Sequence, residues 1–387
     1  MKKNLPNIVT VFGLFLTILS GVLWLHEPCW FAVVLCTIGR VLDLADGVVA
    51  RRLKAVSQIG KWLDPLSDKL GIYFILAILL PDGVNPWILA AAAGLDYAST
   101  ALRVAGISSI SAKTPGKLKT TLQSLSLATF PVATLTGTHI CIFVGNGLLI
   151  VAVAFAVFSI WQKSGNLANF LTCCNAVSGA LAIVAAGQHC WWLFSSLVIA
   201  AAIFDVADGI IARRSGNIGS SGALLDDFSD ALSFGIAPAV AVWSYCHIEY
   251  PIAGIGISMI YFFTVVIRLV HFTKHKGITP KGFFDGVPSP AGAGLAGFAI
   301  LPEWPVMVVL LITVGGSVLM ATFKRRWPHF GHLFHMSNDC ILWNGCAIII
   351  GALITTSIFS LSAVPFGIIV AYLFTPLWNK PDTETAT

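Results

Sequence analysis

Charged side chains are scarce in this sequence of 387 residues. Asp, Glu, Lys and Arg make up 11% of the chain, whereas ordinary soluble domains carry about 25%. Hydrophobic residues make up 57%, and the mean hydropathy is +0.85. This composition excludes a soluble globular enzyme, a disordered chain and a nucleic-acid-binding domain with a basic face. A polytopic membrane protein is the class that fits.

The sequence also lacks the patterns of a disulfide scaffold and of a cleaved signal peptide. Its nine cysteines include no Cys-x-x-Cys pair, so we expect small buried side chains and no disulfide framework. The apolar segment at the start ends at His26, Glu27 and Pro28, without the small residues of a cleavage site. We therefore expect it to be the first retained membrane helix.

Basic residues occur in a few loops and are missing from the turns between those loops. The clusters lie at 2–3, 51–69, 113–119, 163, 213–214, 274–281 and 324–326. The turns near Glu27, Asp82, His189, Glu249 and Glu303 contain no Lys or Arg. This alternation follows the positive-inside rule and places the basic loops on the cytoplasmic side.

One segment of the chain occurs twice. VLDLADGVVARR at 41–52 returns as IFDVADGIIARR at 203–214, an offset of 162 residues. Other matches at this offset are Asn7 with Asn169, Thr10 with Thr172, Gly60 with Gly222, Asp64 with Asp226 and Asp68 with Asp230. The repeat predicts a tandem duplication. We expect one domain over 1–163, a second over 164–380 and a polar tail over 381–387.

Hydropathy predicts an all-α membrane protein made of two tandem helix bundles. We expect about six membrane helices in the first copy and about eight in the second. The first set falls near 7–25, 29–53, 61–80, 85–107, 119–137 and 140–161. The second set begins near 167, 190, 222, 251, 290, 304, 339 and 361.

Each copy contains a group of four aspartates next to apolar helical segments. Carboxylates in a membrane helix are costly in free energy, so these residues are functional candidates. The groups are Asp43, Asp46, Asp64 and Asp68, and then Asp205, Asp208, Asp226 and Asp230. Spacings of three and four residues place each pair on one helix face. A short basic turn brings the two helices together, and four converging carboxylates need a cation. Oxygen ligands favour Mg²⁺, Mn²⁺ or Ca²⁺, and the negative charge of each group is enough for two ions.

Small and basic residues accompany the aspartates at fixed spacing. They are Gly47, Ala50, Arg51 and Gly60 in the first copy, and Gly209, Ala212, Arg213 and Gly222 in the second. The small residues let a ligand approach the helix backbone, and the arginine supplies a planar donor fork for phosphate oxygens. The competing interpretation is that the aspartates only pair with nearby Arg and Lys side chains in helix packing. The exact repetition of the pattern argues against it.

The signature Asp-x-x-Asp-Gly-x-x-Ala-Arg, followed by Gly-x-x-x-Asp-x-x-x-Asp, resembles that of CDP-alcohol phosphatidyltransferases. The resemblance implies transfer of a phosphatidyl group from CDP-diacylglycerol to an alcohol, with release of CMP, at the cytoplasmic face of a bacterial inner membrane. It implies that the first three aspartates of each group hold Mg²⁺ or Mn²⁺. The fourth, Asp68 or Asp230, then acts as general base. It also implies that CDP-diacylglycerol is bound by Thr10, Thr172 and the small and basic residues above.

The second copy is similar to bacterial phosphatidylserine synthases. The segments that carry the likeness are Asn169–Asn175, Ser233–Pro238, Arg268–Phe272 and Phe284–Ala291. The resemblance implies L-serine as the acceptor. Because serine has a carboxylate, Arg268 is its candidate partner. His271 stands where this family usually has a second arginine.

The first copy is similar to phosphatidylglycerophosphate synthases over Asn4–Phe12, Leu63–Leu70 and Gly116–Gln123. The resemblance implies glycerol 3-phosphate as the acceptor, with its phosphate bound by Arg103, Lys113, Lys117 and Lys119. Gly13 and Leu95-Asp96 depart from the pattern, which usually has arginine at the first position and Arg-Glu at the second. The acceptor is then open to an alternative, such as the existing phospholipid phosphatidylglycerol.

Three other interpretations remain. One half is catalytic and the other a scaffold; the fusion replaces the homodimer that is usual for this family by an intramolecular pseudo-dimer; or the chain transports divalent cations or lipids. A transporter needs charged residues along a path across the membrane, whereas here the acids lie near the cytoplasmic helix ends. Membrane lipids are expected partners, and nucleic acids are not.

Overall fold

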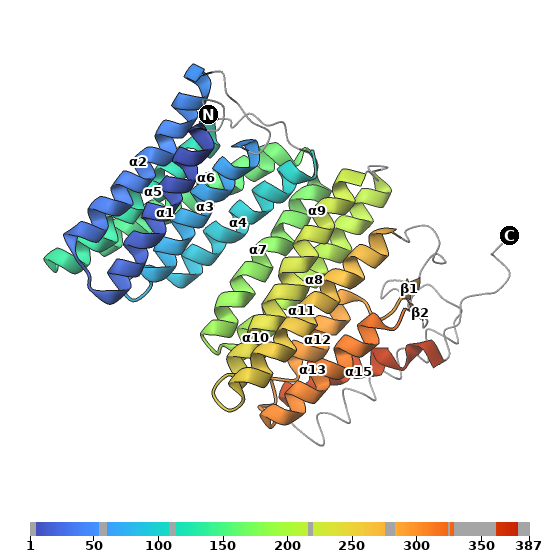
Figure 1. The fold of residues 1–387 in the computed structure, drawn as a ribbon. Coiled ribbons are helices and arrows are strands. Elements are labelled where there is room, and N and C mark those ends of the chain that lie inside the picture. The colour runs from blue at the N-terminus through green and yellow to red at the C-terminus, as the bar shows by residue number, and fades with distance from the viewer. Residues whose placement is uncertain are drawn as a thin grey trace. The chain divides into compact units, whose positions relative to one another are not determined.

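The computed structural model describes residues 5–53, 60–107, 114–215, 220–274, 283–323, 326–328 and 361–377, and these are almost entirely helical. The all-α prediction is confirmed. By its internal contacts the chain divides into two compact units (Figure 1). One contains 1–96 and 110–162, and the other contains 97–109 and 163–387. The domain ranges expected from the repeat stay a prediction, and by these contacts the described residues 97–107 group with the second unit.

The first unit is a bundle of apolar helices. They are α1 (Leu5–His26), α2 (Trp30–Leu53), α3 (Gly60–Ile78), the start of α4 (Pro86–Val104), α5 (Thr114–Thr136) and α6 (Ile140–Ser164). Helix α1 packs along α2 and α3. Buried Trp24, Leu76, Phe130 and Leu149 belong to the core of this unit. The helix borders follow the hydropathy pattern because each apolar segment buries one face against its neighbours.

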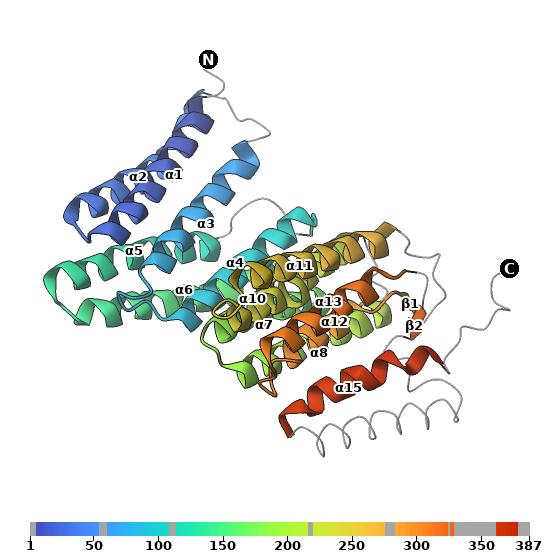
Figure 2. The same cartoon turned by 60° about the horizontal axis from the view of Figure 1, so that its bottom comes forward.

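The second unit begins with two long helices, α7 (Leu167–Gly187) and α8 (Trp191–Arg214), packed side by side. Next comes a continuous helical run made of α9 (Ser220–Asp230), the π-helical segment η2 (Ala231–Ile236) and α10 (Ala237–Cys246). The helices that follow among the described residues are α11 (Pro251–Lys274), α12 (Ser289–Phe298), α13 (Val306–Ala321) and α15 (Val364–Leu373), with 3₁₀ turns at Leu361–Ala363 and Thr375–Leu377. Helix α15 packs against α12 (Figure 2).

One feature was absent from the sequence prediction. Strand β1 (Phe283–Asp285) pairs antiparallel with β2 (Arg326–Pro328), and Asp285 opposes Arg326 in the register. Their side chains form an ion pair with 3.6 Å between Oδ1 and Nε. This two-stranded sheet joins the segment after α11 to the segment after α13.

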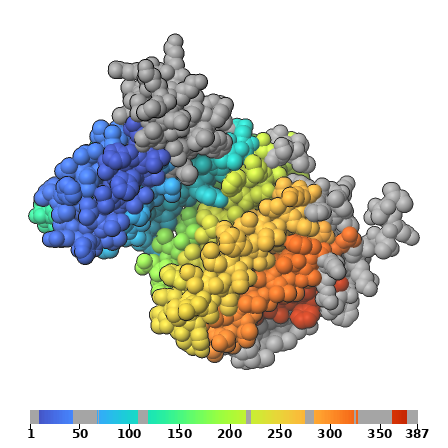
Figure 3. All heavy atoms as spheres, in the orientation of Figure 1, coloured from blue at the N-terminus to red at the C-terminus, as the bar shows by residue number. Residues whose placement is uncertain are grey.

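Five of the described helices are long and apolar enough to cross a membrane. They are Val9–His26, Ile140–Ser164, Leu167–Gly187, Trp191–Arg214 and Pro251–Lys274. Large apolar side chains lie exposed on α11 and α13, among them Ile252, Phe263 and Leu311. Both helices contribute to the surface of the second unit that Figure 3 shows. Such surfaces suit contact with lipid rather than water. The helix expected near 339 and the tail at 381–387 lie outside the described residues.

Candidate active site

Helices α8 and α9 bring three carboxylates of the second group together. Asp205 and Asp208 lie on α8, and Asp226 lies on α9; one carboxylate oxygen from each is within 4.8 Å of the others. Asp208 is 6% exposed. Three carboxylates this close repel one another unless a cation lies between them. Oxygen ligands in this number suit a divalent cation such as Mg²⁺. The donor set therefore fits a metal site, although no particular ion is specified by it.

Helix α7 donates hydrogen bonds to two of the aspartates. The hydroxyl of Thr172 donates to Asp208 Oδ2 at 2.5 Å. One helical turn later, Nδ2 of Asn175 donates to Asp230 Oδ1 at 3.1 Å. Because positions three residues apart share a helix face, one side of α7 orients a carboxylate from each of the other two helices. The role of Thr172 in binding CDP-diacylglycerol stays a prediction.

Asp230 lies where α9 changes into the π-helix η2, and π-helical turns are frequent at functional sites. The hydroxyl of Ser233 in this segment donates to the backbone oxygen of Asn175 at 2.8 Å. A Cβ on Gly179 would lie 2.7 Å from the Cα of Ser233, so only glycine permits this approach of η2 to α7. Tyr261 on α11 donates to the backbone oxygen of Phe234 at 2.7 Å. These contacts fix the segment that carries Asp230.

Arg268 is buried on α11 with only 5% of its surface exposed. Its Nη1 donates to the hydroxyl of Ser289 at 2.6 Å, and Cζ lies 5.7 Å from the centre of the Phe284 ring. Its Nε has no hydrogen-bond partner within the described part of the chain. One turn further, the ring of His271 stacks on Phe323 with 3.9 Å between centres. Arg268 is thus a buried cation with donor capacity remaining, as an anion-binding residue requires.

The other predicted residues of the second site lie at the ends of α8 and α9. A Cβ on Gly209 would lie 3.2 Å from Nη1 of the exposed Arg213, so the guanidinium covers this glycine. Ala212 lies one residue before Arg213 and is partly exposed. Gly222 lies in the first turn of α9, where a Cβ would be 3.9 Å from Asn169 Oδ1. Their contact with substrate stays a prediction.

For the first site, the structure gives helices but few side chains. Asp43, Asp46, Gly47, Ala50 and Arg51 fall in α2, and Gly60, Asp64 and Asp68 fall in α3; the side chains of these residues lie outside the described part. The same holds for the side chain of Lys117 on α5, and Lys113 falls outside the described residues altogether. Thr10 is buried on α1, and Arg103 is partly exposed near the end of α4.

Lys119, a predicted acceptor residue of the first copy, makes contacts that the sequence did not predict. It is buried and forms an ion pair with the buried Asp96. Asp96 Oδ2 also accepts from the Tyr73 hydroxyl at 2.6 Å and from Gln123 Nε2 at 3.3 Å. Lys69, which follows Asp68, donates to the backbone oxygen of Asp96 at 2.8 Å. From the sequence, Asp96 was notable only as a departure from the pattern of related enzymes. Because both side chains are buried, the negative charge of Asp96 balances the positive charge of Lys119.

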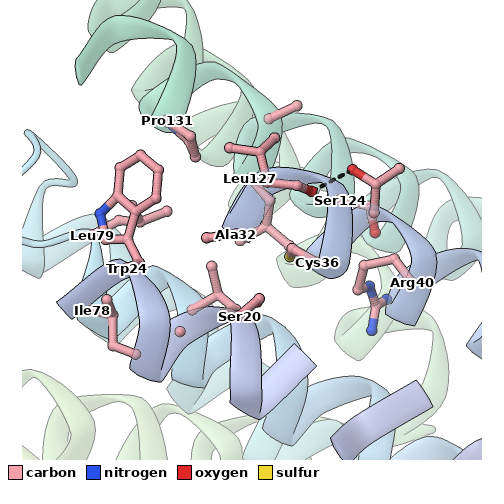
Figure 4. Close-up of a pocket in the computed structure, with 15 residues that line it drawn as sticks. Ser20, Trp24, Ala32, Cys36, Arg40, Ile78, Leu79, Ser124, Leu127 and Pro131 are labelled. Atoms are coloured by element: carbon pink, nitrogen blue, oxygen red, sulfur yellow. Dashed lines mark hydrogen bonds between the residues drawn. The ribbon is translucent and has the colours of Figure 1, made fainter. Parts of the chain in front are cut away.

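A cavity of about 170 Å³ lies in the first unit between α1, α2, α3 and α5. Trp24 lies at one end and Arg40 at the other, with Ala32 and Cys36 between them (Figure 4). Most of the lining is apolar. Hydrocarbon suits such a space better than a nucleotide or a small polar acceptor does.

Comparison with known proteins gives two matches along the chain. The family model described as CDP-alcohol phosphatidyltransferase matches residues 3–158 and again 165–329.

Several curated relatives are similar to parts of the chain. The CDP-diacylglycerol–serine O-phosphatidyltransferase of Methanocaldococcus jannaschii is 32% identical over 185 residues, which is 47% of this chain and 85% of the relative. The protein of that name from Bacillus subtilis is 28% identical over 166 residues, 42% of this chain and 92% of the relative. A CDP-diacylglycerol–glycerol-3-phosphate 3-phosphatidyltransferase of Cereibacter sphaeroides is 37% identical over 94 residues, 23% of this chain and 42% of the relative. Each match covers less than half of the chain.

Proposed function

The chain belongs to the CDP-alcohol phosphatidyltransferase family, and we propose that it serves two acceptors, L-serine in its C-terminal half and glycerol 3-phosphate in its N-terminal half. It is an integral membrane enzyme of phospholipid synthesis. The proposed products are phosphatidylserine and phosphatidylglycerophosphate, each formed from CDP-diacylglycerol with release of CMP. One observation carries the proposal: the complete signature occurs twice, and in the second copy the oxygens of Asp205, Asp208 and Asp226 lie within 4.8 Å of one another.

In this proposal the first three aspartates of each group hold Mg²⁺ or Mn²⁺, two ions at each site. When bound, the ions neutralise charge on the pyrophosphate of CDP-diacylglycerol and on CMP as it leaves. Asp230 takes the proton of the serine hydroxyl while the serine oxygen bonds to the phosphorus that carries diacylglycerol, and the bond from that phosphorus to CMP breaks. Asn175 holds the Asp230 carboxylate in place during this transfer. Asp68 has the same role in the N-terminal half.

The proposed nucleotide site uses the helix ends. Arg213 is exposed at the end of α8, where its planar guanidinium can donate to phosphate oxygens. Basic loops beside both signatures support active sites on the cytoplasmic side of a bacterial inner membrane. The fused halves would form an intramolecular pseudo-dimer; the alternative is a homodimer of two complete chains.

A second candidate acceptor for the N-terminal half is favoured by the Asp96–Lys119 pair. Glycerol 3-phosphate is a dianion, and Lys119 already faces a buried carboxylate. Gly13 supplies no charge where related enzymes usually have arginine. An acceptor with less negative charge, such as phosphatidylglycerol, would need fewer cations. A scaffold role for this half is the outcome if no acceptor works.

The test is CMP release from CDP-diacylglycerol by the purified full chain in detergent with Mg²⁺. L-serine, glycerol 3-phosphate, inositol phosphate and phosphatidylglycerol are offered separately. Release with both serine and glycerol 3-phosphate supports the proposal. Release with serine and phosphatidylglycerol only would replace the first acceptor, and no release with serine would overturn the assignment of the C-terminal half.

Replacing Arg268 by Lys should raise the KM for L-serine. Lysine keeps the positive charge but loses the planar donor fork, including the Nε that has no partner within the described residues. Loss of charge-assisted hydrogen bonds predicts an increase of about 10- to 100-fold, while the KM for CDP-diacylglycerol changes little. Initial rates of CMP release against serine concentration measure it.

His271→Arg is the matched control for this variant. A guanidinium can stack on Phe323 as the imidazole does, so phosphatidylserine formation should be retained. Collapse of activity in His271→Arg, or an unchanged KM for serine in Arg268→Lys, would move the serine pocket elsewhere.

A further inference from the structure

The side-chain amide oxygen of Asn175, Oδ1, is buried and has no role in the reaction described above. The residue is fully buried on α7. Its Nδ2 donates to Asp230, and because a carboxylate only accepts, the amide must present its nitrogen to Asp230 and turn its oxygen away. This oxygen, Oδ1, has no hydrogen-bond partner among the residues that the structure describes. A buried acceptor without a partner is costly, so a ligand that donates to it would bind favourably.

The position of this oxygen is fixed from two sides. The backbone oxygen of Asn175 accepts from Ser233, and Gly179 allows the π-helical segment to approach α7 closely. The side chain is held by Asp230. A hydrogen-bond acceptor held in this way is preorganised and loses little conformational entropy when a ligand arrives.

Three chemically different groups meet in this part of the second unit. In the proposed reaction Asp230 accepts the proton of a hydroxyl. Arg268 lies on α11, which packs against the η2 segment that begins next to Asp230, and its buried Nε has no hydrogen-bond partner among the described residues. Asn175 Oδ1 adds a neutral acceptor beside Asp230. A 2-amino-3-hydroxy acid has the complementary groups: a hydroxyl, a carboxylate and, on the carbon next to the hydroxyl-bearing one, an ammonium.

We propose that Asn175 Oδ1 accepts a hydrogen bond from the ammonium group of the acceptor. It thereby selects a hydroxy amino acid over a hydroxy acid that has no ammonium group. This inference rests on the proposed serine transfer by the C-terminal half. The duplication supports it, because the position equivalent to Asn175 in the first copy is Gly13, which has no side chain to offer. The half proposed to use an acceptor without an ammonium lacks the group that would bind one.

The first test uses the unchanged full chain in detergent with CDP-diacylglycerol and two analogues of serine. 3-Hydroxypropionate lacks the ammonium, and N,N,N-trimethylserine keeps the positive charge but has no N–H donor. Both should be used with a kcat/KM at least about 10-fold below that of L-serine. If trimethylserine works as well as serine, the inference fails while the proposed function stands. If serine itself gives no CMP, both fail.

The second test is Asn175→Leu, which keeps the approximate volume and removes the oxygen. The preference for L-serine over 3-hydroxypropionate, as a ratio of kcat/KM values, should fall about 10- to 100-fold. If the substitution also disturbs Asp230, the rates with both substrates fall, and this common effect cancels in the ratio. An unchanged ratio would overturn the inference.

Ser178→Ala is the matched control. Ser178 lies one turn further on α7, and among the described residues its hydroxyl donates to the backbone oxygen of Cys174 within the helix. The ratio should stay as in the unchanged chain. If Asn175→Leu does not fold, the analogues on the unchanged chain decide the question.

Discussion

Asp230→Asn should abolish serine-dependent CMP release and leave the activity of the N-terminal half intact. An asparagine has the same size, and its oxygen can still accept from Nδ2 of Asn175, so the local fold should survive. It cannot accept the proton of the acceptor hydroxyl. Loss of a positioned general base lowers kcat by about 10²- to 10⁴-fold. Separate assays with L-serine and with the acceptor of the first half measure both activities in one preparation.

Two variants complete this experiment. Asp68→Asn should have the opposite pattern, with loss of the first activity and retention of the serine activity. Asp227→Asn is the matched control, because Asp227 lies on the same helix but outside the repeated signature, and its Oδ2 accepts from Thr273. It should remain active. If Asp230→Asn eliminates both activities, the halves do not act independently.

Much of the fold was predictable from the sequence, because runs of apolar residues mark the position and length of the membrane helices. The helices expected at 29–53 and 140–161 are α2 (Trp30–Leu53) and α6 (Ile140–Ser164). The π-helical turn after Asp230 was not predictable in this way. It depends on contacts of Ser233 with α7 and of Phe234 with α11, and a one-residue widening of a helix leaves no periodic signal.

The candidate site also has features that were predictable from the sequence and features that were not. The spacing of three residues between Asp205 and Asp208 predicted that they share a helix face, and the approach of Asp226 followed from the short turn between helices. The Asp96–Lys119 pair and the Asn175–Asp230 hydrogen bond join residues more than 20 positions apart, so no local pattern could reveal them. Such pairings follow from tertiary packing alone.

Asp226→Asn should remove the divalent ions of the C-terminal half and with them the serine activity. The three carboxylate oxygens within 4.8 Å would become two, and the amide adds no charge. Because metal ions contribute several kcal/mol of charge stabilisation in such transfers, we expect kcat to fall by at least about 10³-fold. Mn²⁺ bound to the full chain, measured by electron paramagnetic resonance titration in detergent, should fall to about half of the unchanged value, since the N-terminal group stays complete.

The alternative in which the aspartates only pack helices together predicts the reverse. Removing one charge from three crowded carboxylates would relieve repulsion and stabilise the fold, without changing Mn²⁺ binding. Thermal unfolding with and without Mn²⁺ separates the two: an ion bound only to the folded state raises the midpoint in the unchanged chain and raises it less in Asp226→Asn. Activity that persists after EDTA treatment would overturn the metal assignment. Asp227→Asn should bind Mn²⁺ as the unchanged chain does, because its carboxylate is paired with Thr273.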